Sequence, residues 1–499
     1  MPMRRLVQCL LAMLLCTLPL ALGHASETPE PTLRALLIGC DYFVEQENTY
    51  PAAENNIRRL AETLMADTRG YALIRTSASA IGSVAQFQDV VQGTLGDAKE
   101  SDISLLYIST HGVFDEGSSN TAASLILSDG TREECLNALT LQEILDQIPG
   151  QKVVILDGCN SGAFIGKGLS GGADRVLFCD LDYKVLCSAG GSEASWYWQG
   201  ADRDAVASGA SYFATVLCDA LGGQGDFAAD MNHDGRITLS EAYQYIYDNY
   251  AASTPQVYPQ NDSAFVLYQY DPAAQDVPTK AVTDITFADT LLSAGQSSVT
   301  FAFTVQRQVE LYYQVVYHQN GAWQFSAAQH FQDGEQTDGT VLPGRKERTL
   351  RLDTGDQDAF GYAMIQFITM EDGSPTLQGA RLLCIAPAEG PVQLGVVTDP
   401  VFAPASGQEL CILAQYDKPC GLTVSIHNEL GQLVRYICYA TPARPQQLSP
   451  MASAFYWDGR KSDGALADPG QYTVRVRTTI AGETYACQSV PFELTEKEP

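Results

Sequence analysis

Two stretches, Ser104–Gly112 (SLLYISTHG) and Lys152–Gly162 (KVVILDGCNSG), decide how the first half of this chain folds. Each begins with a short apolar run, which is typical of a strand buried on both faces of a sheet. Each run ends at small and polar residues, with His111 in one stretch and Cys159 in the other. In an open parallel sheet, ligands bind outside the carboxyl ends of the strands. We therefore expect His111 and Cys159 to lie at the same edge of one sheet.

Further strands and helices alternate with these two runs between residues 31 and 271. Arg34–Gly39 and Lys184–Ser188 are apolar runs, whereas Ala53–Met65 and Leu141–Gln147 have helical spacing. Such alternation predicts an α/β domain, with a mostly parallel sheet and helices on both faces.

The pattern of predicted elements changes after a linker at residues 272–280, which is rich in proline and lacks periodicity. Residues 281–390 and 396–495 contain alternating strands, turn signals and little helix. This pattern predicts two all-β, Ig-like sandwiches of roughly 100 residues each.

The composition is that of a soluble globular protein with an acidic surface. Of 499 residues, 45% are hydrophobic, and 30 Lys and Arg stand against 59 Asp and Glu, a net charge of −29. These proportions exclude a disordered or collagen-like chain. A surface this acidic repels phosphate backbones, so nucleic acid is not an expected partner.

The first 25 residues have the pattern of a signal peptide. Arg4 and Arg5 precede an apolar stretch, and Gly23 and Ala25 are small residues suited to cleavage before Ser26. No later run reaches the roughly 18 apolar residues of a spanning helix. We expect a secreted protein without a transmembrane anchor.

Thirteen cysteines are present, and removal of Cys9 and Cys16 with the signal peptide leaves eleven. Because eleven is odd, at least one thiol is free or paired between molecules. In an oxidising compartment, the C-terminal cysteines could form disulfides. These are Cys411, Cys420, Cys438 and Cys487.

Cys159 and His111 together suggest nucleophilic catalysis. An imidazole beside a thiol lowers the pKa of the thiol and places a general acid near a leaving amine. Small neighbours would free the backbone N–H groups of Gly112 and Cys159 to stabilise an oxyanion. A buried thiol and a structural histidine are the alternative, but the coincidence of two strand ends favours catalysis.

These motifs resemble those of a known enzyme superfamily. Thr110-His111-Gly112 and Asp157–Gly162 (DGCNSG) are similar to the histidine and cysteine motifs of the caspase, metacaspase and legumain (clan CD) cysteine peptidases. Leu36–Asp41 (LLIGCD) and residues 53–56 (AENN) resemble the superfamily's first strand and first helix. The resemblance covers residues 33–270. It implies a caspase-like fold and hydrolysis of polypeptide substrates through an acyl-enzyme, with His111 and Cys159 as the dyad.

The resemblance is looser at the S1 pocket, which receives the side chain before the cleaved bond (P1). Metacaspases cut after Arg or Lys and use two acids there. Asp157 occupies one position, but Asn56 stands at the other, which leaves a slight preference for a basic P1. Glu193 and Trp196 are candidates for the S1 wall, or they belong to a surface loop with buried aromatics.

A glycine-rich stretch follows the cysteine motif and contains Lys167 and Arg175. Many relatives are cleaved after the cysteine strand, so this stretch could be a processing loop. It could equally be a flexible loop that stays uncut.

Residues 230–241 (DMNHDGRITLSE) fit the twelve-residue EF-hand loop. Helical segments at Ser211–Leu221 and Ser240–Tyr250 flank it. The pattern predicts a structural Ca²⁺ ion, and the alternative is a polar turn followed by a capped helix. The expected ligands are the side chains of Asp230, Asn232, Asp234 and Glu241 and the backbone carbonyl of Arg236.

The last domain resembles the Ig-like domain of FlgD-type flagellar hook-capping proteins, which recurs in secreted bacterial hydrolases. Phe455–Arg460 (FYWDGR) and Pro469–Val474 (PGQYTV) carry the resemblance. It implies that Trp457 is a core residue. The domain could hold substrate, attach to a cell surface or act as a spacer.

Three functions are compatible with these features. The leading interpretation is a secreted bacterial cysteine endopeptidase. The alternative is a non-catalytic secreted binding or adhesion protein on a caspase-like scaffold. A third uses the same dyad for transpeptidation. The presence of both His111 and Cys159 favours an enzyme.

Overall fold

The computed structural model divides the chain into residues 1–31 and 32–499, and the fold below is that of the second unit. The predicted signal peptide lies outside the described residues. Within the described part, no helix is long and apolar enough to cross a membrane. The described residues are 31–44, 52–115, 117–169, 173–198, 210–274, 280–293, 298–319, 322–334, 338–352, 361–371, 374–386, 392–404, 408–444, 451–480 and 483–496.

A six-stranded sheet organises the first half of this unit, in the order β12-β8-β7-β3-β1-β2. All pairings in it are parallel except that of β12 with β8. The strands are β1 (Leu33–Gly39), β2 (Tyr71–Ala78), β3 (Ile103–Ser109), β7 (Gln151–Asp157), β8 (Tyr183–Cys187) and β12 (Gln256–Tyr258).

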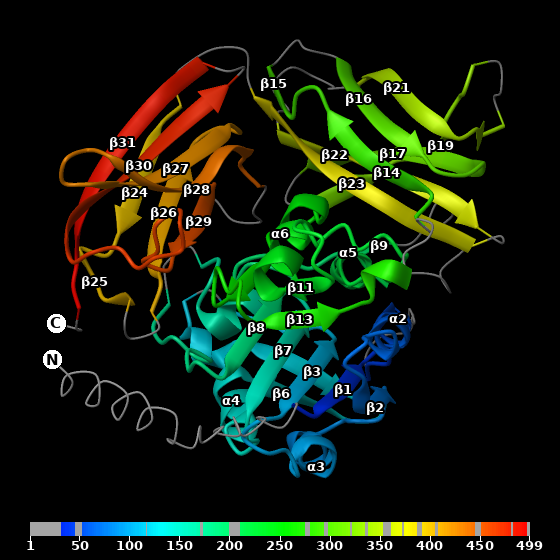
Figure 1. The fold of residues 1–499 in the computed structure, drawn as a ribbon, viewed down its shortest axis with the longest axis vertical. Helices are drawn as coiled ribbons and strands as arrows, with labels where there is room; N and C mark the ends of the chain where they lie inside the picture. The colour runs from blue at the N-terminus through cyan, green and yellow to red at the C-terminus, as the bar shows by residue number, and fades with distance from the viewer. Residues whose placement is uncertain are drawn as a thin grey trace, which may run out of the picture. The chain divides into compact units, whose positions relative to one another are not determined.

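Alternate residues of β1 belong to different hydrophobic clusters. Leu37 packs in one cluster with Leu60 of α2, whereas Leu36 packs in the other with Phe87 of α3. Figure 1 shows the strands with their helices. The first cluster includes α2 (Ala52–Met65), α5 (Tyr212–Ala220) and α6 (Leu239–Asn249), and the second α3 (Val84–Leu95) and α4 (Ala138–Leu145).

The start of α2 is held by the residue that ends the LLIGCD stretch. The carboxylate of Asp41 accepts hydrogen bonds from the backbone N–H groups of Ala53 at 2.8 Å and Glu54 at 2.7 Å. A carboxylate at a helix N-terminus satisfies free N–H groups and interacts favourably with the helix dipole. The side chain of Asp41 therefore fixes the helix that carries Asn56.

Short strands form three smaller sheets outside the large one. One small sheet follows His111 directly, and two further pairs, β9–β10 and β11–β13, lie later in the chain. The strands are β4 (Gly112–Val113), β5 (Ser124–Ser128), β6 (Glu133–Asn137), β9 (Tyr197–Trp198), β10 (Ala210–Ser211), β11 (Arg236–Thr238) and β13 (Val266–Gln269).

Residues 280–386, here called the middle module, form two sheets around an apolar core. One sheet contains β14 (Val282–Phe287), β16 (Ser298–Val305) and β21 (Gly344–Arg351). The other is built on β17 (Val309–Gln319), β22 (Gly361–Glu371) and β23 (Ser374–Ala386), with β15 (Leu291–Ser293), β18 (Ala322–Phe325), β19 (Gln329–His330) and β20 (Thr340–Val341).

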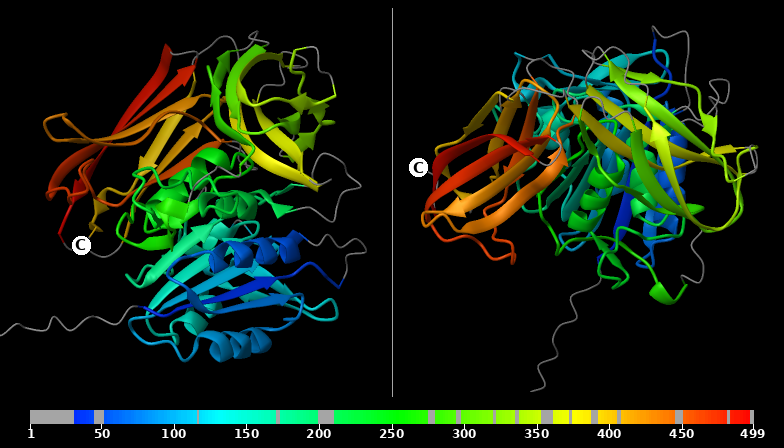
Figure 2. Two further views of the ribbon diagram at one scale, coloured as in Figure 1. Left: turned by 45° about the vertical axis from the view of Figure 1, so that its right-hand side comes forward. Right: turned by 90° about the horizontal axis from the view of Figure 1, so that it is seen from above.

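Residues 392–496, the C-terminal module, also form two sheets, and Figure 2 shows both modules from two further sides. Trp457 is fully buried in the core between them. One sheet contains β24 (Leu394–Thr398), β26 (Leu410–Tyr416) and β29 (Ala452–Trp457). The other contains β25 (Val401–Phe402), β27 (Gly421–Asn428), β28 (Leu433–Pro442), β30 (Gly470–Ile480) and β31 (Glu483–Leu494).

The middle module shares a hydrophobic cluster with the α/β part of the chain. Trp323 and Met364 from its strands belong to the same cluster as Tyr212 of α5 and Ile246 of α6. Helix α5 and the apolar face of α6 therefore pack in a cluster shared by the large sheet and the middle module.

The eleven cysteines in the described part of the chain, Cys40 to Cys487, are all free thiols. The disulfides considered for the four C-terminal cysteines are thus not formed. Cys420 is buried and Cys411 and Cys438 are half-buried, so most of these thiols serve as small apolar core residues.

Candidate active site

The register of β3 and β7 brings the two sequence motifs together. Ser109, the last residue of β3, pairs with Asp157, the last residue of β7. The backbone N–H of Thr110 continues the ladder by donating to the carbonyl of Asp157 at 3.1 Å. His111 and Cys159 each follow two residues after this pair. The same edge of the sheet therefore carries both.

Two glycines allow the loops after these strands to pack backbone against backbone. A Cβ atom on Gly112 would lie 1.7 Å from the carbonyl oxygen of Cys159. A Cβ on Gly158 would lie 2.5 Å from the carbonyl oxygen of Thr110. Any side chain at either position would force the two loops apart.

The Cys159 thiol faces backbone hydrogen-bond donors. Ser195 N–H donates to Sγ at 3.4 Å, and Sγ donates to the Ser195 carbonyl at 3.8 Å. Burial raises the pKa of this thiol, while the N–H groups of Ser195, Cys159 and Gly112 lower it. Burial has the larger effect, so the thiol is protonated near neutral pH. The N–H groups of Gly112 and Cys159, proposed from sequence to bind an oxyanion, thus lie beside the sulfur.

His111 is half-buried and packs against Phe43 with tilted rings, 4.5 Å between the ring centroids. Burial lowers the pKa of its imidazole, and the nearby Glu133 carboxylate raises it by a smaller amount. The imidazole is therefore mainly neutral near pH 7 and able to accept a proton.

Asp157 and Asn56, the two S1 candidates, meet beneath this edge. The Asn56 Nδ2 group lies 3.5 Å from the Asp157 carboxylate and 3.0 Å from Ser109 Oγ. Asn56 is fully buried and Asp157 is 3% exposed. Both side chains form the floor of the site and not its rim.

The Asp157 carboxylate is well supplied with hydrogen-bond donors. Tyr107 donates its hydroxyl at 2.7 Å, Ser211 donates Oγ, and Ser195 Oγ lies at 3.5 Å. Burial raises the pKa of Asp157 to about 6, although these hydroxyl donors oppose the rise. The carboxylate is therefore largely ionised at neutral pH.

Sequence reasoning missed these hydroxyl donors. Tyr107 lies within a strand that the sequence predicted, and Ser195 within the SAGGSEASWYW stretch that supplied the S1 candidates. Ser211 also caps α5, since its Oγ accepts from the N–H of Ala214 at 2.9 Å. A serine before a helix is a visible capping signal, but its contact with Asp157 depends on tertiary structure.

Glu193 and Trp196, the candidates for the S1 wall, turn into the protein. Glu193 is 3% exposed, and its carboxylate accepts from Gly190 N–H at 3.1 Å and Thr254 N–H at 2.7 Å. Trp196 is half-buried against the apolar core. In this structure the Glu193 carboxylate holds the loop in place, and Trp196 keeps part of its surface exposed.

Tyr197 is the aromatic residue on the open side of this loop, with 39% of its surface exposed. Desolvation of its hydroxyl raises its pKa, with smaller contributions from the charges of Asp157 and Cys159. Its neighbour in the β9–β10 pair is Ser211, which donates to Asp157. Tyr197 is thus an exposed aromatic residue beside Ser211, which binds Asp157.

The two basic residues of the glycine-rich stretch differ in accessibility. Lys167 is buried and forms an ion pair with Glu409 of the C-terminal module. Arg175 is exposed, and its backbone is held by the Asn120 side chain at 2.8 and 3.0 Å. Only Arg175 is accessible to a processing enzyme here.

In the loop at residues 230–241, the expected side-chain ligands of calcium accept hydrogen bonds from the chain itself. The carboxylates of Asp230 and Asp234 accept from N–H groups of the loop itself, at Gly235 and Arg236 respectively, both at 2.9 Å. Glu241 accepts from Thr238 N–H at 2.9 Å in the capping box that starts α6.

Within the described part of the chain, no group of three or more His, Cys, Asp or Glu side chains is arranged to hold a metal. Asn232 and Arg236 supply the other two expected ligands. Asn232 Oδ1 accepts from Asp234 N–H at 2.9 Å, and Arg236 lies in β11. Oxygen ligands of the right type are present, and Glu241 caps the helix through Oε2.

Together, these features define a caspase-type domain with a cysteine and a histidine at the carboxyl edge of its sheet. Residues 32–274 match the model of the caspase domain family, Peptidase C14, and this part of the chain belongs to that family. A caspase-family domain provides a cysteine-peptidase-like scaffold. No curated protein matches the chain.

Distant likenesses to solved structures accompany the family match. Protein GSU0716 from Geobacter sulfurreducens is 16% identical, with 48% of this chain and 98% of that chain covered and a TM-score of 0.33. Caspase-1 from Spodoptera frugiperda is 15% identical over 47% and 92%, with a TM-score of 0.31. FlgD from P. aeruginosa is 22% identical over 20% and 74%, with a TM-score of 0.16.

Proposed function

We propose that this protein is a cysteine endopeptidase in which Cys159 is the nucleophile and His111 the general base and acid. The observation that carries the proposal is the Ser109–Asp157 register, which sets both residues two positions beyond paired strand ends. The close approach of Gly112 to Cys159 supports it, because the two loops share one backbone contact.

In the proposed reaction, Cys159 Sγ attacks the carbonyl carbon of a peptide bond while His111 accepts the thiol proton. The oxyanion that forms is stabilised by the N–H groups of Gly112 and Cys159. His111 returns the proton to the leaving amine, and the acyl-enzyme remains. Water, deprotonated by His111, then hydrolyses the thioester and regenerates the thiol. A neutral thiol and a neutral imidazole in the free protein fit this general-base route.

For the residue before the cleaved bond, we propose a slight preference for Arg or Lys. The Asp157 carboxylate is negatively charged near neutral pH. Of the two positions that are acidic in a metacaspase S1 pocket, Asp157 is the acidic one, and Asn56 is neutral. The carboxylate oxygens of Asp157 already accept from Tyr107 and Ser211, which weakens the attraction for a basic side chain.

We also propose that the protein acts outside the cell, from the signal-peptide pattern of residues 1–25. A single calcium ion in the 230–241 loop is also part of this proposal. Asp230, Asn232, Asp234 and Glu241 and the Arg236 carbonyl would hold it as a structural cation.

The test uses the purified chain and a Cys159→Ala variant with fluorogenic peptides bearing Arg, Lys, Asn or Asp at P1. We expect turnover by the wild-type protein, fastest with Arg or Lys, and a loss of at least about 1000-fold in the variant. Equal turnover by both proteins would contradict the assignment of Cys159. No turnover, with no labelling of Cys159 by a peptidyl thiol reagent, would favour the alternative function, a non-catalytic binding or adhesion protein on a caspase-like scaffold.

An amine acceptor added to the same assay separates hydrolysis from transpeptidation. Hydrolysis yields a free carboxylate, whereas transpeptidation joins the acyl group to the added amine. We expect the carboxylate as the main product, read by mass spectrometry.

A further inference from the structure

The C-terminal module contacts the loop that holds Cys159, and the first contact is made by Arg444. Its guanidinium donates to the carbonyl oxygens of Tyr250 at 2.6 Å and Ser253 at 2.7 Å, and also to that of Tyr247. The same guanidinium lies 4.3 Å from the centroid of the Tyr247 ring. Arg444 thus binds the C-terminal end of α6 and the turn after it. A cation at a helix C-terminus interacts favourably with the free carbonyls.

The turn after α6 in turn holds the loop of residues 190–195. Thr254 donates to the Glu193 carboxylate through N–H at 2.7 Å and Oγ1 at 2.9 Å. Ser253 Oγ donates to the carbonyl of Ala194. The next residue is Ser195, whose N–H and carbonyl both contact Cys159 Sγ. Three hydrogen-bonded steps therefore connect Arg444 with the sulfur.

A second contact reaches the loop that follows Cys159. Glu409 pairs with Lys167 inside the protein, where the two side chains are 6% and 4% exposed. Tyr456 accepts the N–H of Gly168 at 2.7 Å through its hydroxyl. Lys167 and Gly168 in turn hold residues 190–195. The Lys167 carbonyl accepts from the Gly191 N–H at 2.8 Å, and the Gly168 carbonyl accepts from the Ser192 N–H at 3.0 Å.

The contacts are buried, so both sides depend on each other. A buried charge or N–H group that loses its partner is strongly disfavoured, and the backbone shifts to find another one. Lys167 and Gly168 in the first loop thus bond side chains of the C-terminal module directly. Residues 190–195 reach the module through Ser253, Thr254 and the first loop.

We propose that the C-terminal module is a positioning element of the active site, in which Arg444, Glu409 and Tyr456 hold the two loops that place Ser195 against Cys159. These three residues are positioning residues, since none of them touches the sulfur. The proposal rests on the peptidase function proposed above. It assigns the module a role in the reaction that attachment or spacing would not require.

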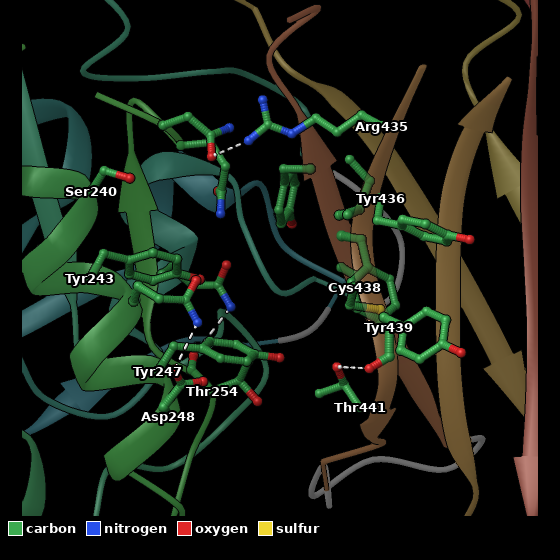
Figure 3. A pocket seen from close by; sticks show the side chains of 18 residues that line it. Ser240, Tyr243, Tyr247, Asp248, Thr254, Arg435, Tyr436, Cys438, Tyr439 and Thr441 are labelled. Atoms are coloured by element: carbon green, nitrogen blue, oxygen red, sulfur yellow. Dashed lines mark hydrogen bonds between the residues drawn. The ribbon is translucent and has the colours of Figure 1, made fainter. Parts of the chain in front are cut away.

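Arg435 offers a matched control on the same face of the module. It reaches toward the α/β part at the rim of a cavity of about 380 Å³ between α6 and β28, where it donates to Asn261 Oδ1 at 2.8 Å (Figure 3). Arg435 thus crosses the same interface through Asn261. In the described part of the chain, Asn261 bonds Arg435 and Ser263, not residues 190–195.

The experiment compares Arg444→Ala, Arg444→Lys, Tyr456→Phe and Arg435→Ala in the full-length protein. Two properties of folded protein are measured: kcat and KM for the best peptide, and the rate of Cys159 alkylation by iodoacetamide against pH, read by mass spectrometry of the Cys159 peptide. Hydrogen exchange of residues 159–169 and 189–195 reports whether the loops loosen.

For Arg444→Ala we expect kcat to fall about 10- to 100-fold, because a small displacement of a reacting group costs this much. The alkylation profile should move to higher pH as the Ser195 N–H leaves the sulfur, and the two loops should exchange faster. Arg444→Lys should recover part of each property, and Arg435→Ala should match the wild type. Tyr456→Phe, which removes only a hydroxyl, should loosen residues 166–169.

If Arg444→Ala and Tyr456→Phe alter neither loop exchange nor Cys159 alkylation, the positioning role is wrong. The positioning role is also wrong if Arg435→Ala changes all three properties as strongly as Arg444→Ala. Alkylation and exchange do not need turnover. A wild-type protein without peptidase activity whose Cys159 responds to Arg444→Ala would refute the peptidase function and still support the positioning contact.

Discussion

The edge of the sheet at Cys159 and the loop at residues 230–241 both carry a complete sequence motif, yet the structure treats them differently. His111 and Cys159 lie 48 positions apart in the sequence and are brought to one edge by strand pairing. Asp230 and Glu241 lie in one short segment, and their carboxylates are directed to different partners.

The difference lies in what competes with the functional arrangement. At the sheet edge, a full ladder of backbone hydrogen bonds sets the register, and no local alternative satisfies those groups. In the loop, Asp, Asn and Glu side chains can accept from nearby backbone N–H groups without any metal. The Thr238–Glu241 capping box is such an alternative. A motif distributed over paired strands is therefore the stronger structural evidence.

After the loss of Cys159 itself, replacement of Gly112 by alanine should have the largest effect, because it disrupts the sheet edge directly. The new Cβ would lie 1.7 Å from the Cys159 carbonyl oxygen, so the loops must separate. We expect kcat/KM to fall at least about 100-fold. Peptide hydrolysis by Gly112→Ala, with active protein counted by Cys159 labelling, checks this.

Gly93→Ala is the matched control for that substitution. Gly93 lies inside α3, and a Cβ there meets nothing within 4 Å. Alanine is favoured over glycine in a helix, so the free energy of unfolding should rise by about 0.5–1 kcal/mol with unchanged activity. If Gly112→Ala retains wild-type kcat/KM, the two loops do not need their close contact.

Asp157 should make the stability of the sheet edge depend on pH. Burial raises its pKa in the folded state from 3.8 to about 6, so the folded protein binds the proton more tightly than the unfolded chain. The unfolded state then holds fewer protons between these values, and the free energy of unfolding falls as pH rises through them. We expect this contribution to fall by about 2 kcal/mol between pH 4.5 and 7.5.

The Asp157→Asn variant isolates that contribution, since asparagine does not titrate. Urea unfolding of both proteins across this pH range gives the difference in free energy at each pH. The variant should gain stability relative to the wild type as pH rises. A difference that stays constant with pH would show that Asp157 has an ordinary pKa.

Calcium should have a smaller effect, because the loop already satisfies its carboxylates with its own N–H groups and Glu241 also caps α6. With a dissociation constant near 1 mM, 10 mM Ca²⁺ would raise the free energy of unfolding by about 1.4 kcal/mol. Urea unfolding with calcium, magnesium or chelator measures this.

Glu241→Gln is the variant that separates the two roles of Glu241. Glutamine keeps an acceptor for the capping box but lacks the charge that calcium requires. We expect unchanged stability in chelator and no response to calcium. A calcium response in neither protein would leave the loop as a polar turn with a capped helix.

The smallest effect is expected from proteolysis of the loop after Cys159. Trypsin should cut after the exposed Arg175 well before Lys167, whose ammonium group is buried against Glu409. Mass spectrometry of a digestion time course gives the order of cleavage. Early cleavage after Lys167 would mean that the C-terminal module releases this loop in solution.

Much of the α/β part was predictable because its strands are buried and apolar along their whole length. The predicted strand at Ser104–Ser109 appears as Ile103–Ser109, and the predicted helix at Ala53–Met65 as Ala52–Met65. β2 escaped prediction because it is an edge strand that is largely exposed and lacks a continuous apolar run.

The candidate site was predictable only in part. His111 and Cys159 stand out because glycine and polar residues end two apolar runs abruptly. The burial of Glu193 could not be predicted, since its residue type says nothing about Thr254, its partner 61 positions away. The hydrogen bond from Ser211 to Asp157 was equally unpredictable, because the two residues lie 54 positions apart.

The sequence by itself determined the strands, the helices and the chemistry available at each strand end, because these follow from local apolar patterns and residue types. Only the tertiary structure decided which polar side chains face the site and which brace it. Burial makes each such group bind whatever partner the fold provides, and the partner is often far away in the chain. Arg444, nearly 300 residues after Cys159, shows this most clearly, since no local pattern marks it.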